Sequence, residues 1–501
     1  APSLVGSEMC IRDSINGAIF NMIQNDLNLI LPEILLSIFA MLALIFGVYR
    51  GQDKKTATLT LATAGLMLIV GMWMIFGGSS SEAAFNNMFI SDAFSRYAKA
   101  LILLSSAAVL IMSLGYMLRH DLGRFEYPIL IIFSVVGMMF MVSANDLMVL
   151  YLGLELQSLA LYVVASIRRE SLKSTEAGMK YFVLGALSSG LLLYGASLIY
   201  GYSGSTNFQS IIISLDSGSV SLGLMFGMIL LVAGLAFKIS AVPFHMWTPD
   251  VYEGSPTPVT AFLSTAPKIA AMALFARVVY DAFYVLISDW QQVVALMSVL
   301  SMFVGAIAAI GQTNIKRLMA YSSIAHMGYA MIGLASGTLL GLQAMLVYMA
   351  IYLAMNIGTF AFIMSMERDG QPVTDIGSLS QLGVKQPGRA LAMLVLLFSL
   401  AGVPPLVGFF GKLYVLRAAY DAGLIWLAVM GVLASVIGAY YYLRLVYLMY
   451  FGEKQDLSLD IVKSPILSGF AATAAVVMVL GIINLFGIEA AASLAASSLI
   501  N

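Results

Sequence analysis

The stretch Leu235-Ala-Phe-Lys-Ile-Ser-Ala-Val-Pro-Phe-His-Met-Trp247 carries a lysine and a proline inside an apolar segment. A second apolar segment is interrupted in the same manner, at Phe398-Ser-Leu-Ala-Gly-Val-Pro-Pro-Leu-Val-Gly-Phe-Phe-Gly-Lys412. A proline inside a helix has no amide hydrogen to donate to the carbonyl four residues earlier. In lipid, a carbonyl freed in this way needs a polar partner or a water-filled cavity. The two stretches therefore predict a pair of broken helices with polar groups at each break.

The proline positions identify the freed carbonyls. Those freed by Pro243, Pro404 and Pro405 belong to Ile239, Leu400 and Ala401 respectively. A lone proline kink, which membrane helices tolerate, is the plainer explanation of either stretch. Two breaks five segments apart favour a functional explanation, because paired broken helices in inverted halves mark the site of many transporters.

The composition indicates a membrane protein. Of 501 residues, 60% are hydrophobic and 10% are charged, and the mean hydropathy is +0.94, whereas soluble domains carry about 25% charged residues. A water-soluble core of this size cannot use so much apolar surface, so lipid must be the solvent. Apolar segments near or above the ~20 residues of a spanning helix occur at 29–49, 56–77, 95–118, 127–144, 146–167, 175–201, 219–242, 256–285, 290–311, 318–336, 339–366, 389–419, 423–450 and 466–488. The sequence thus predicts an all-α polytopic membrane protein with about fourteen transmembrane helices in a single membrane domain, 22–501.

Basic residues are unevenly divided between the two faces that these spans would create. Sixteen lie in or beside the loops that follow odd-numbered segments: Arg50, Lys54, Lys55, Arg119, Arg124, Arg168, Arg169, Lys173, Lys316, Arg317, Arg368, Lys385, Arg389, Arg444, Lys454 and Lys463. Four lie toward the other face: Arg96, Lys99, Arg277 and Arg417. Because cytoplasmic loops carry an excess of lysine and arginine, the odd-to-even loops are predicted to be cytoplasmic and both termini to lie on the opposite side.

A five-segment repeat, about 127–285 and about 290–450, has an odd number of spans, so its two copies are predicted to be inverted.

Five ionisable residues lie well inside apolar segments: Glu155, Lys180, Lys238, Lys268 and Lys412. A charge at the centre of a span costs about 2.5–3.5 kcal/mol, so such residues are normally functional, paired or both. Burial disfavours the charged form of a lysine, and a nearby carboxylate restores it. Alternating glutamate and lysine, bridged by water, therefore predicts a stepwise proton relay.

Plainer explanations differ in strength among these residues. Glu176 precedes Lys180 by four residues, in the order that favours an ion pair at a helix end. Lys412 follows the second break by about two turns and could extend to the membrane surface. The other three lack a neighbour of opposite charge or lie in the middle of their span, which favours a functional role.

Two histidines could extend the relay, because imidazole both donates and accepts hydrogen bonds. For His245, a structural role in which the ring bonds a freed carbonyl is equally supported. For His326, the surroundings Tyr321-Ser-Ser-Ile-Ala-His-Met-Gly-Tyr329 favour the relay.

Several functions are excluded by what the sequence lacks. The single cysteine, Cys10, permits no disulfide within the chain, and the three histidines show no metal-ligand spacing. A net charge of −1 gives no indication of a nucleic-acid partner. We find no dinucleotide-binding fingerprint, so any redox chemistry is expected in other chains. The run from Ala1 to Ser14 is mixed and polar. Residues 1–21 are expected to be a non-native or disordered extension, with Met22 a natural start.

Two longer motifs resemble a known family. The stretch Phe237–Ser264, which runs on to Pro267-Lys268, resembles the signature of the antiporter-like subunits of respiratory complex I. The stretch Asn314–Tyr329 is similar to that family's second-half motif, and the resemblance extends from Met22 to Asn501. Lys412 follows the second break where the M-type sibling has glutamate. The chain also stops soon after the last segment, without the long lateral helix of the L-type sibling. These two differences favour the remaining branch of the family, which is neither M-type nor L-type.

The resemblance implies a fold and a function. It implies fourteen helices, two inverted five-helix repeats and a polar axis along the membrane midplane. Glu155 and Lys180 would form the first-half pair, Lys238 would be the central proton carrier, Lys268 a connector and Lys412 the terminal carrier. The chain would be a non-redox, proton-translocating subunit of NADH-quinone oxidoreductase in the bacterial inner membrane, with its termini in the periplasm.

The resemblance also implies partners. NADH, FMN, iron–sulfur clusters and quinone would be bound by partner subunits and none by this chain. Sibling antiporter-like subunits and the lipid bilayer would surround it. The alternative is a subunit of a multi-subunit cation/proton antiporter, which shares the fold and the first motif. A purely structural scaffold is disfavoured by the five buried charges.

Overall fold

The computed structural model describes residues 23–49, 52–78, 81–216, 221–453, 459–460 and 464–500. The predicted extension, 1–21, with Cys10, lies outside the described residues, as do Arg50, Lys454 and Lys463 among the basic residues counted above.

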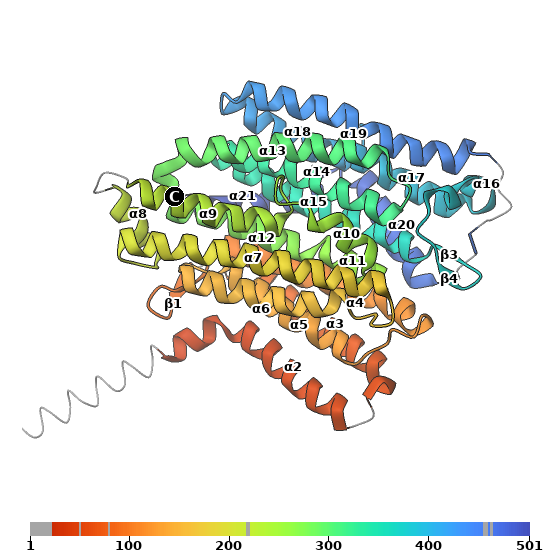
Figure 1. The fold of residues 1–501 in the computed structure, drawn as a ribbon, viewed down its shortest axis with the longest axis horizontal. Helices are drawn as coiled ribbons and strands as arrows, with labels where there is room; N and C mark the ends of the chain where they lie inside the picture. The colour runs from red at the N-terminus through yellow and green to blue at the C-terminus, as the bar shows by residue number, and fades with distance from the viewer. Residues whose placement is uncertain are drawn as a thin grey trace, which may run out of the picture.

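Helices make up almost all of the described chain (Figure 1). The longer helices of the first half are α2 (Leu31–Tyr49), α3 (Thr56–Phe76), α4 (Ala93–Arg119), α5 (Glu126–Val142), α6 (Leu147–Ala165), α7 (Leu172–Ser203), α9 (Leu222–Ile239) and α12 (Ala266–Arg277). Those of the second half are α13 (Ile287–Ile310), α14 (Ile315–Ala335), α15 (Leu339–Met364), α17 (Pro387–Ala401), α18 (Val407–Asp421), α19 (Ile425–Phe451), α20 (Pro465–Leu480) and α21 (Ile488–Leu499).

Shorter elements connect these helices. They are the helices α8 (Phe208–Asp216), α10 (Trp247–Gly254), α11 (Thr257–Leu263) and α16 (Leu382–Lys385), the 3-10 turns η1 (Gln52–Lys55), η3 (Tyr284–Leu286), η4 (Ile376–Leu379) and η5 (Asn484–Gly487), and the π turn η2 (Val278–Ala282). Two small antiparallel hairpins pair β1 (Glu82–Ala84) with β2 (Phe89–Ser91) and β3 (Glu367–Arg368) with β4 (Gln371–Pro372).

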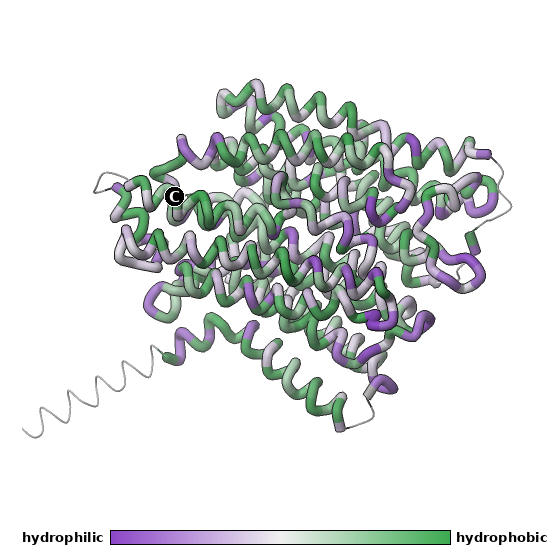
Figure 2. Tube along the Cα trace, viewed as in Figure 1, coloured by the Kyte–Doolittle hydropathy of each residue, from purple (hydrophilic) through white to green (hydrophobic). Residues whose placement is uncertain are grey.

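The helices form a polytopic membrane protein, as the composition predicts. Among the described residues, ten helical segments are long and apolar enough to cross a membrane, and an eleventh results if the pair Pro465–Leu480 and Asn484–Leu499, bent by 109°, counts as one. Figure 2 shows hydrophilic residues gathered at the two ends of the helices and mostly hydrophobic residues between them. Because a helix satisfies its own backbone hydrogen bonds, this arrangement suits lipid.

Burial separates the centre of the bundle from its edges. The apolar window of Thr257–Ala282 is entirely buried, whereas in α2 and α19, at opposite edges (Figure 1), only a third of the window is buried. Large apolar side chains such as Leu42 and Val436 point outward from these edge helices. Such faces require lipid or other membrane subunits around them.

Both interruptions lie where the prolines predict them. Helix α9 ends at Ile239, and helix resumes at Trp247; α17 ends at Ala401, and α18 begins at Val407. The residue after each helix is in the left-handed conformation, with φ of 63° at Ser240 and 81° at Gly402. At both ends the next amide donates to a carbonyl five residues earlier, at 2.8 and 3.0 Å, which is the Schellman closure of a helix.

Three features differ from the prediction. The predicted span 256–285 is not one helix, because α11 ends at Leu263 and α12 begins at Ala266, with Pro267 in its first turn, where a missing amide hydrogen costs little. The predicted span 466–488 is instead α20, a sharp turn and α21. Helices α8 and α10 lie where only connections were expected, since their sequences mix polar and apolar residues without a long apolar run.

Candidate functional site

Each break ends at a carbonyl that accepts a hydrogen bond from a buried lysine. The Nζ of Lys268, in the first turn of α12, lies 3.0 Å from the carbonyl oxygen of Ile239. The Nζ of Lys412, in α18, lies 2.9 Å from that of Ala401. Both carbonyls are among those that the prolines were predicted to free. The predicted need for a polar partner is therefore met by two of the predicted relay residues.

Each of these lysines also contacts a serine hydroxyl and an aromatic ring. Lys268 donates to the Oγ of Ser240 and lies 5.1 Å from the centre of the Trp247 ring. Lys412 donates to the Oγ of Ser435 at 3.0 Å and lies 4.7 Å from the centre of the Tyr329 ring. Neutral oxygens and ring faces can stabilise an ammonium without fixing its charge as strongly as a carboxylate does. These surroundings suit a lysine that takes up and releases a proton.

Gly402 is required at the second break for two reasons. Its φ of 81° is one that other residues rarely adopt. A Cβ at this position would lie 2.9 Å from the Cδ of Lys412, so the lysine stem passes directly over the backbone. A side chain at this position would therefore require the stem of Lys412 to shift.

Lys238 lies in the last turn of α9 and faces α6. It is 6% exposed, and its Nζ donates to the Oγ of Ser158 at 2.7 Å. Glu155, one turn before Ser158 on α6, is half-buried, close enough to act electrostatically on Lys238, and its Oε1 has no hydrogen-bond partner among the described residues. Lys238 therefore has one neutral hydroxyl partner and one nearby carboxylate.

Lys180 lies in a different environment. Its ammonium forms ion pairs with Glu176 at 2.8 Å and with Asp250 at 2.7 Å, and its side chain is 42% exposed. Asp250, on α10, also pairs with Arg317 of α14 at 2.7 Å. Burial alone would raise the pKa of Asp250, but the hydrogen bonds from Lys180 and Arg317 outweigh it and hold that pKa below its ordinary value. The structure thus places Lys180 in an ion cluster at a helix end and does not pair it with Glu155.

His326 is the centre of a hydroxyl cluster that the sequence did not reveal in full. Its ring is 2% exposed, with Nδ1 2.6 Å from the hydroxyl of Tyr348 and Nε2 3.1 Å from that of Tyr442. The Tyr442 hydroxyl in turn lies 2.5 Å from the Oγ of Ser322. Tyrosines in an apolar span are ordinarily packing residues, so sequence alone gave no reason to select Tyr348 or Tyr442.

His245 lies in the chain between α9 and α10 and is half-buried. The Ile239 carbonyl that it was one candidate to bind accepts from Lys268 instead. Its part in the relay stays a prediction.

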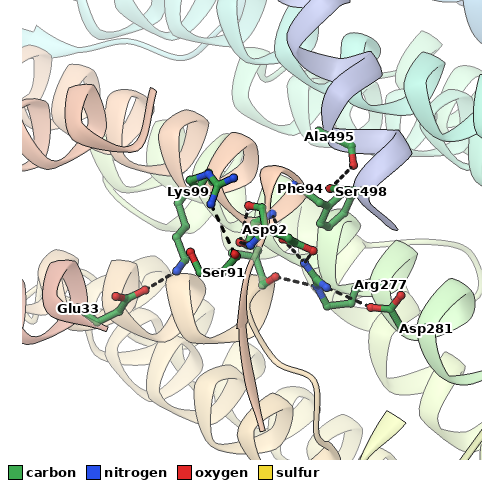
Figure 3. Close-up of polar contacts among 12 residues, drawn as sticks. Glu33, Ser91, Asp92, Phe94, Lys99, Arg277, Asp281, Ala495 and Ser498 are labelled. Carbon is green, nitrogen blue, oxygen red and sulfur yellow. Dashed lines mark hydrogen bonds and ion pairs between the residues drawn. The ribbon is translucent and has the colours of Figure 1, made fainter. Parts of the chain in front are cut away.

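Buried ion pairs near the opposite end of the bundle were not anticipated either. Figure 3 shows Lys99 of α4 reaching Glu33 of α2, and Arg277 between Asp92 and Asp281. The Lys99–Glu33 distance is 2.6 Å, and Arg277 binds both oxygens of Asp92 at 2.8 and 2.9 Å. In the sequence, Lys99 and Arg277 are recognisable only as charges toward that face. Their partners lie far away in sequence, so the pairing depends on the fold.

The described residues contain no group of three or more histidine, cysteine, aspartate or glutamate side chains that could hold a metal ion.

Comparison with known proteins gives consistent matches. Residues 144–438 match the family described as "NADH:quinone oxidoreductase/Mrp antiporter, TM". The chain is 61% identical over 484 residues to NADH-quinone oxidoreductase subunit N of Jannaschia sp. (strain CCS1), covering 96% of this chain and 100% of the relative.

Solved structures share the fold. A chain of respiratory complex I from Thermus thermophilus superposes with a TM-score of 0.78 at 30% identity, covering 92% of this chain and 99% of the other. A chain of the Mrp complex from Dietzia sp. DQ12-45-1b gives a TM-score of 0.80 at 22% identity, covering 94% and 97%, which shows likeness of fold alone.

Proposed function

This chain belongs to the family of NADH-quinone oxidoreductase subunit N, and on that premise we propose that its buried lysines and Glu155 carry protons across the membrane. It is an antiporter-like, proton-translocating membrane subunit of complex I. The sequence predicted this, because it resembles the branch of the family that is neither M-type nor L-type. The observation that carries the site assignment is the pair of contacts in which Lys268 and Lys412 meet the carbonyls at the two helix breaks.

The first half would load a proton at Lys238. With Glu155 ionised, the carboxylate favours the charged lysine; when Glu155 is neutralised or its charge is moved away, burial favours release. Ser158, which accepts from Lys238, can receive and pass on a hydrogen bond without changing charge. Lys268 would take the proton next, since its ammonium binds the Ile239 carbonyl at the end of α9, the helix that carries Lys238. Lys412 would hold the proton in the second half.

We also propose the number of spans, the internal repeats and the orientation of the chain in the membrane. Each of the fourteen predicted segments overlaps a described helix or a broken pair of helices, which supports fourteen spans. Matching Schellman closures at Ser240 and Gly402 support two inverted repeats, about 127–285 and about 290–450. The excess of basic residues in odd-to-even loops supports cytoplasmic loops there and termini in the periplasm of a bacterial inner membrane.

Partner subunits would supply the energy. The complex contains other membrane subunits, and NADH, FMN, iron–sulfur clusters and quinone are proposed to be bound by partners, with no redox step in this chain. Rearrangement in a neighbouring subunit would move charge near Glu155, whose half-buried position lets it respond to a neighbour.

The antiporter alternative is less well supported. The Mrp chain shares the fold at 22% identity, whereas the subunit N relative is 61% identical over nearly the whole chain. A test is to purify the solubilised complex through a tag on this chain and identify its subunits by mass spectrometry. Subunits with iron–sulfur clusters and a quinone site are expected; a small exchanger complex without them would contradict the proposal.

A further inference from the structure

A groove opens at one membrane face of the bundle, where α18 ends and where α15 and α21 begin. Its volume is about 170 Å³. One water needs about 10–15 Å³ of such volume, so the groove has room for a polar group of on the order of ten heavy atoms. Arg417, which lines the groove, is one of the four basic residues predicted to lie toward the non-cytoplasmic side. The groove therefore opens on that side in the proposed orientation.

The groove lies at the level of the lipid headgroups. Tyr420 at the end of α18 and Trp426 at the beginning of α19 are 61% and 52% exposed. Exposed tyrosine and tryptophan rings are enriched at the boundary between hydrocarbon and water. Helix α21 leaves α20, part of a predicted span, at 109°, so α21 runs closer to the membrane plane than to its normal. Glu489, in the first turn of α21, is thereby held beside the end of α18.

The polar wall of the groove holds charges of both signs. Among the described residues that line it, Arg417 is the cation, and Asp421 and Glu489 are the carboxylates. The Arg417 side chain is 75% exposed, and its Nε lies 3.6 Å from the Oδ2 of Asp421, too far for a hydrogen bond. Its guanidinium therefore has donors for another acceptor. The Oε2 of Glu489 accepts from the hydroxyl of Tyr414 at 3.3 Å, which leaves Oε1 open to a further donor.

The opposite wall of the groove is apolar. Leu340, Ala344 and Val347 line it at spacings of four and three residues along α15, so they share one face of that helix. This face runs from the beginning of α15, at the headgroup level, toward the interior of the bilayer. An acyl chain laid along it would bury apolar surface while its headgroup stayed beside the charges.

These charges discriminate among lipid headgroups. An anionic headgroup such as phosphoglycerol would bring a phosphate to Arg417 but would face two carboxylates without a cation of its own. A choline headgroup carries a cation that has no N–H to donate to Glu489. An ethanolamine headgroup carries both a phosphate, which a guanidinium binds through its forked donors, and an ammonium with three donors for the carboxylates.

We propose that this groove is a binding site for a phospholipid of the non-cytoplasmic leaflet with an ethanolamine headgroup. The phosphate binds Arg417, the ammonium binds Glu489 and Asp421, and an acyl chain lies along α15. The lipid joins α15 and α21 to the end of α18, the helix that carries Lys412. The inference takes the orientation from the proposed function and nothing from the proton relay. Lipid labelling therefore tests the site, and proton flux tests the function.

The first test uses the purified wild-type complex in phosphatidylcholine vesicles that contain a trace of phosphatidylethanolamine with a photoreactive diazirine in its acyl chain. After irradiation, mass spectrometry would map the label. Label is expected within residues 340–347 of α15. Unlabelled phosphatidylethanolamine is expected to lower that labelling several-fold, whereas phosphatidylglycerol and the fully N-methylated lipid leave it unchanged. No label at 340–347, as when a neighbouring subunit fills the groove, overturns the inference, and so does equal competition by all three lipids.

The second test compares variants under the same conditions. Arg417→Gln and Glu489→Gln are each expected to lower the labelling of 340–347 several-fold. Arg124→Gln is the control, since it removes an exposed arginine that pairs with Asp53 away from the groove, and it should keep wild-type labelling. Wild-type labelling in assembled Arg417→Gln and Glu489→Gln complexes overturns the inference. The competition series uses the unchanged complex, so it decides the inference even where a variant does not assemble.

Discussion

The ammonium of Lys412 lies 2.9 Å from the carbonyl oxygen of Ala401, the residue at which helix α17 ends. The ammonium of Lys268 contacts the Ile239 carbonyl in the same way. Lys412 lies in α18, the helix that directly follows its break. Lys268 lies in α12, which begins only after a second interruption of the chain. The two halves thus reach one chemical arrangement through different spacings in sequence. What the halves share is a freed carbonyl with a buried lysine and not a fixed motif.

Substituting Gly402 tests this arrangement. Gly402→Ala should shift Lys412 from the Ala401 carbonyl and lower proton flux, with a loss of stability of about 1 kcal/mol or more from the positive φ. Gly190→Ala in α7 is the control, since a Cβ there meets nothing within 4 Å. The measurements are flux in vesicles and thermal stability of the complex. Equal behaviour of the two variants would show that the close approach of Lys412 is unimportant.

Lys238 is expected to be a proton carrier and not a fixed charge. Arginine keeps its proton at any accessible pH. Lys238→Arg should therefore keep the charge and abolish pumping, and Lys238→Ala should remove both the charge and pumping. Protons moved per electron pair would be measured in vesicles, with complex content quantified. Near-normal pumping by an assembled Lys238→Arg complex would refute the carrier role.

Glu155 should act through its charge on Lys238. Glu155→Gln keeps the size of the side chain and removes the charge, so pumping should fall more than assembly does. Glu155→Asp should be impaired less, because the carboxylate is retained but drawn back from Lys238. The role is wrong if the glutamine variant assembles and pumps like the wild type.

Asp250 allows the two explanations of Lys180 to be separated. Because the pKa of Asp250 is depressed in the folded protein, the ion cluster stabilises the fold at pH values above the ordinary aspartate pKa of about 3.9. This stabilisation is lost only as the pH falls through the lower pKa of the folded state. Asp250→Asn should therefore cost about 0.5–1 kcal/mol, the small value of an exposed cluster, and the loss should be constant between neutral and mildly acidic pH. Thermal stability across pH checks this.

A helix-end ion pair requires that Lys180→Ala match Asp250→Asn in stability and retain pumping. A relay role requires instead that Lys180→Ala lower pumping far more than Asp250→Asn. The partners of Lys180 lead us to expect the first outcome.

The predicted orientation can be tested by labelling single cysteines from each side. A cysteine in the loop around Arg168–Lys173 should react only from the cytoplasmic side, and one in the β1–β2 hairpin only from the periplasmic side. Labelling of the 168–173 loop from the periplasm would overturn the orientation and the inverted repeats built on it.

Sequence predicted the membrane fold, the two breaks and the freed carbonyls because these depend on local chemistry. Apolar length signals a span, and proline removes a specific hydrogen bond. The bend after α20 was missed because Asn484, Leu485 and Phe486 adopt positive φ values that their identities do not announce. Pro267 was available as a signal that the span 256–285 contains a second helix start.

Contacts between distant helices were beyond the reach of sequence. The pairing of Lys99 with Glu33, or of Arg277 with Asp92, depends on how helices far apart in the chain pack together. The same holds for the tyrosines around His326, which in sequence look like ordinary packing residues. Residue type identified the ionisable candidates, and only packing assigned their partners.

The two interrupted helices also bear on the membrane voltage. A helix carries a dipole with its negative end at the C-terminus, and α9 and α17 both end inside the protein. In the proposed inverted repeats they approach from opposite sides, so their dipoles oppose one another along the membrane normal. A voltage that favours the orientation of one disfavours that of the other, and the pair has little net sensitivity to it. The electric field can therefore act on the protons that move through this subunit, while its effects on the two broken helices largely cancel.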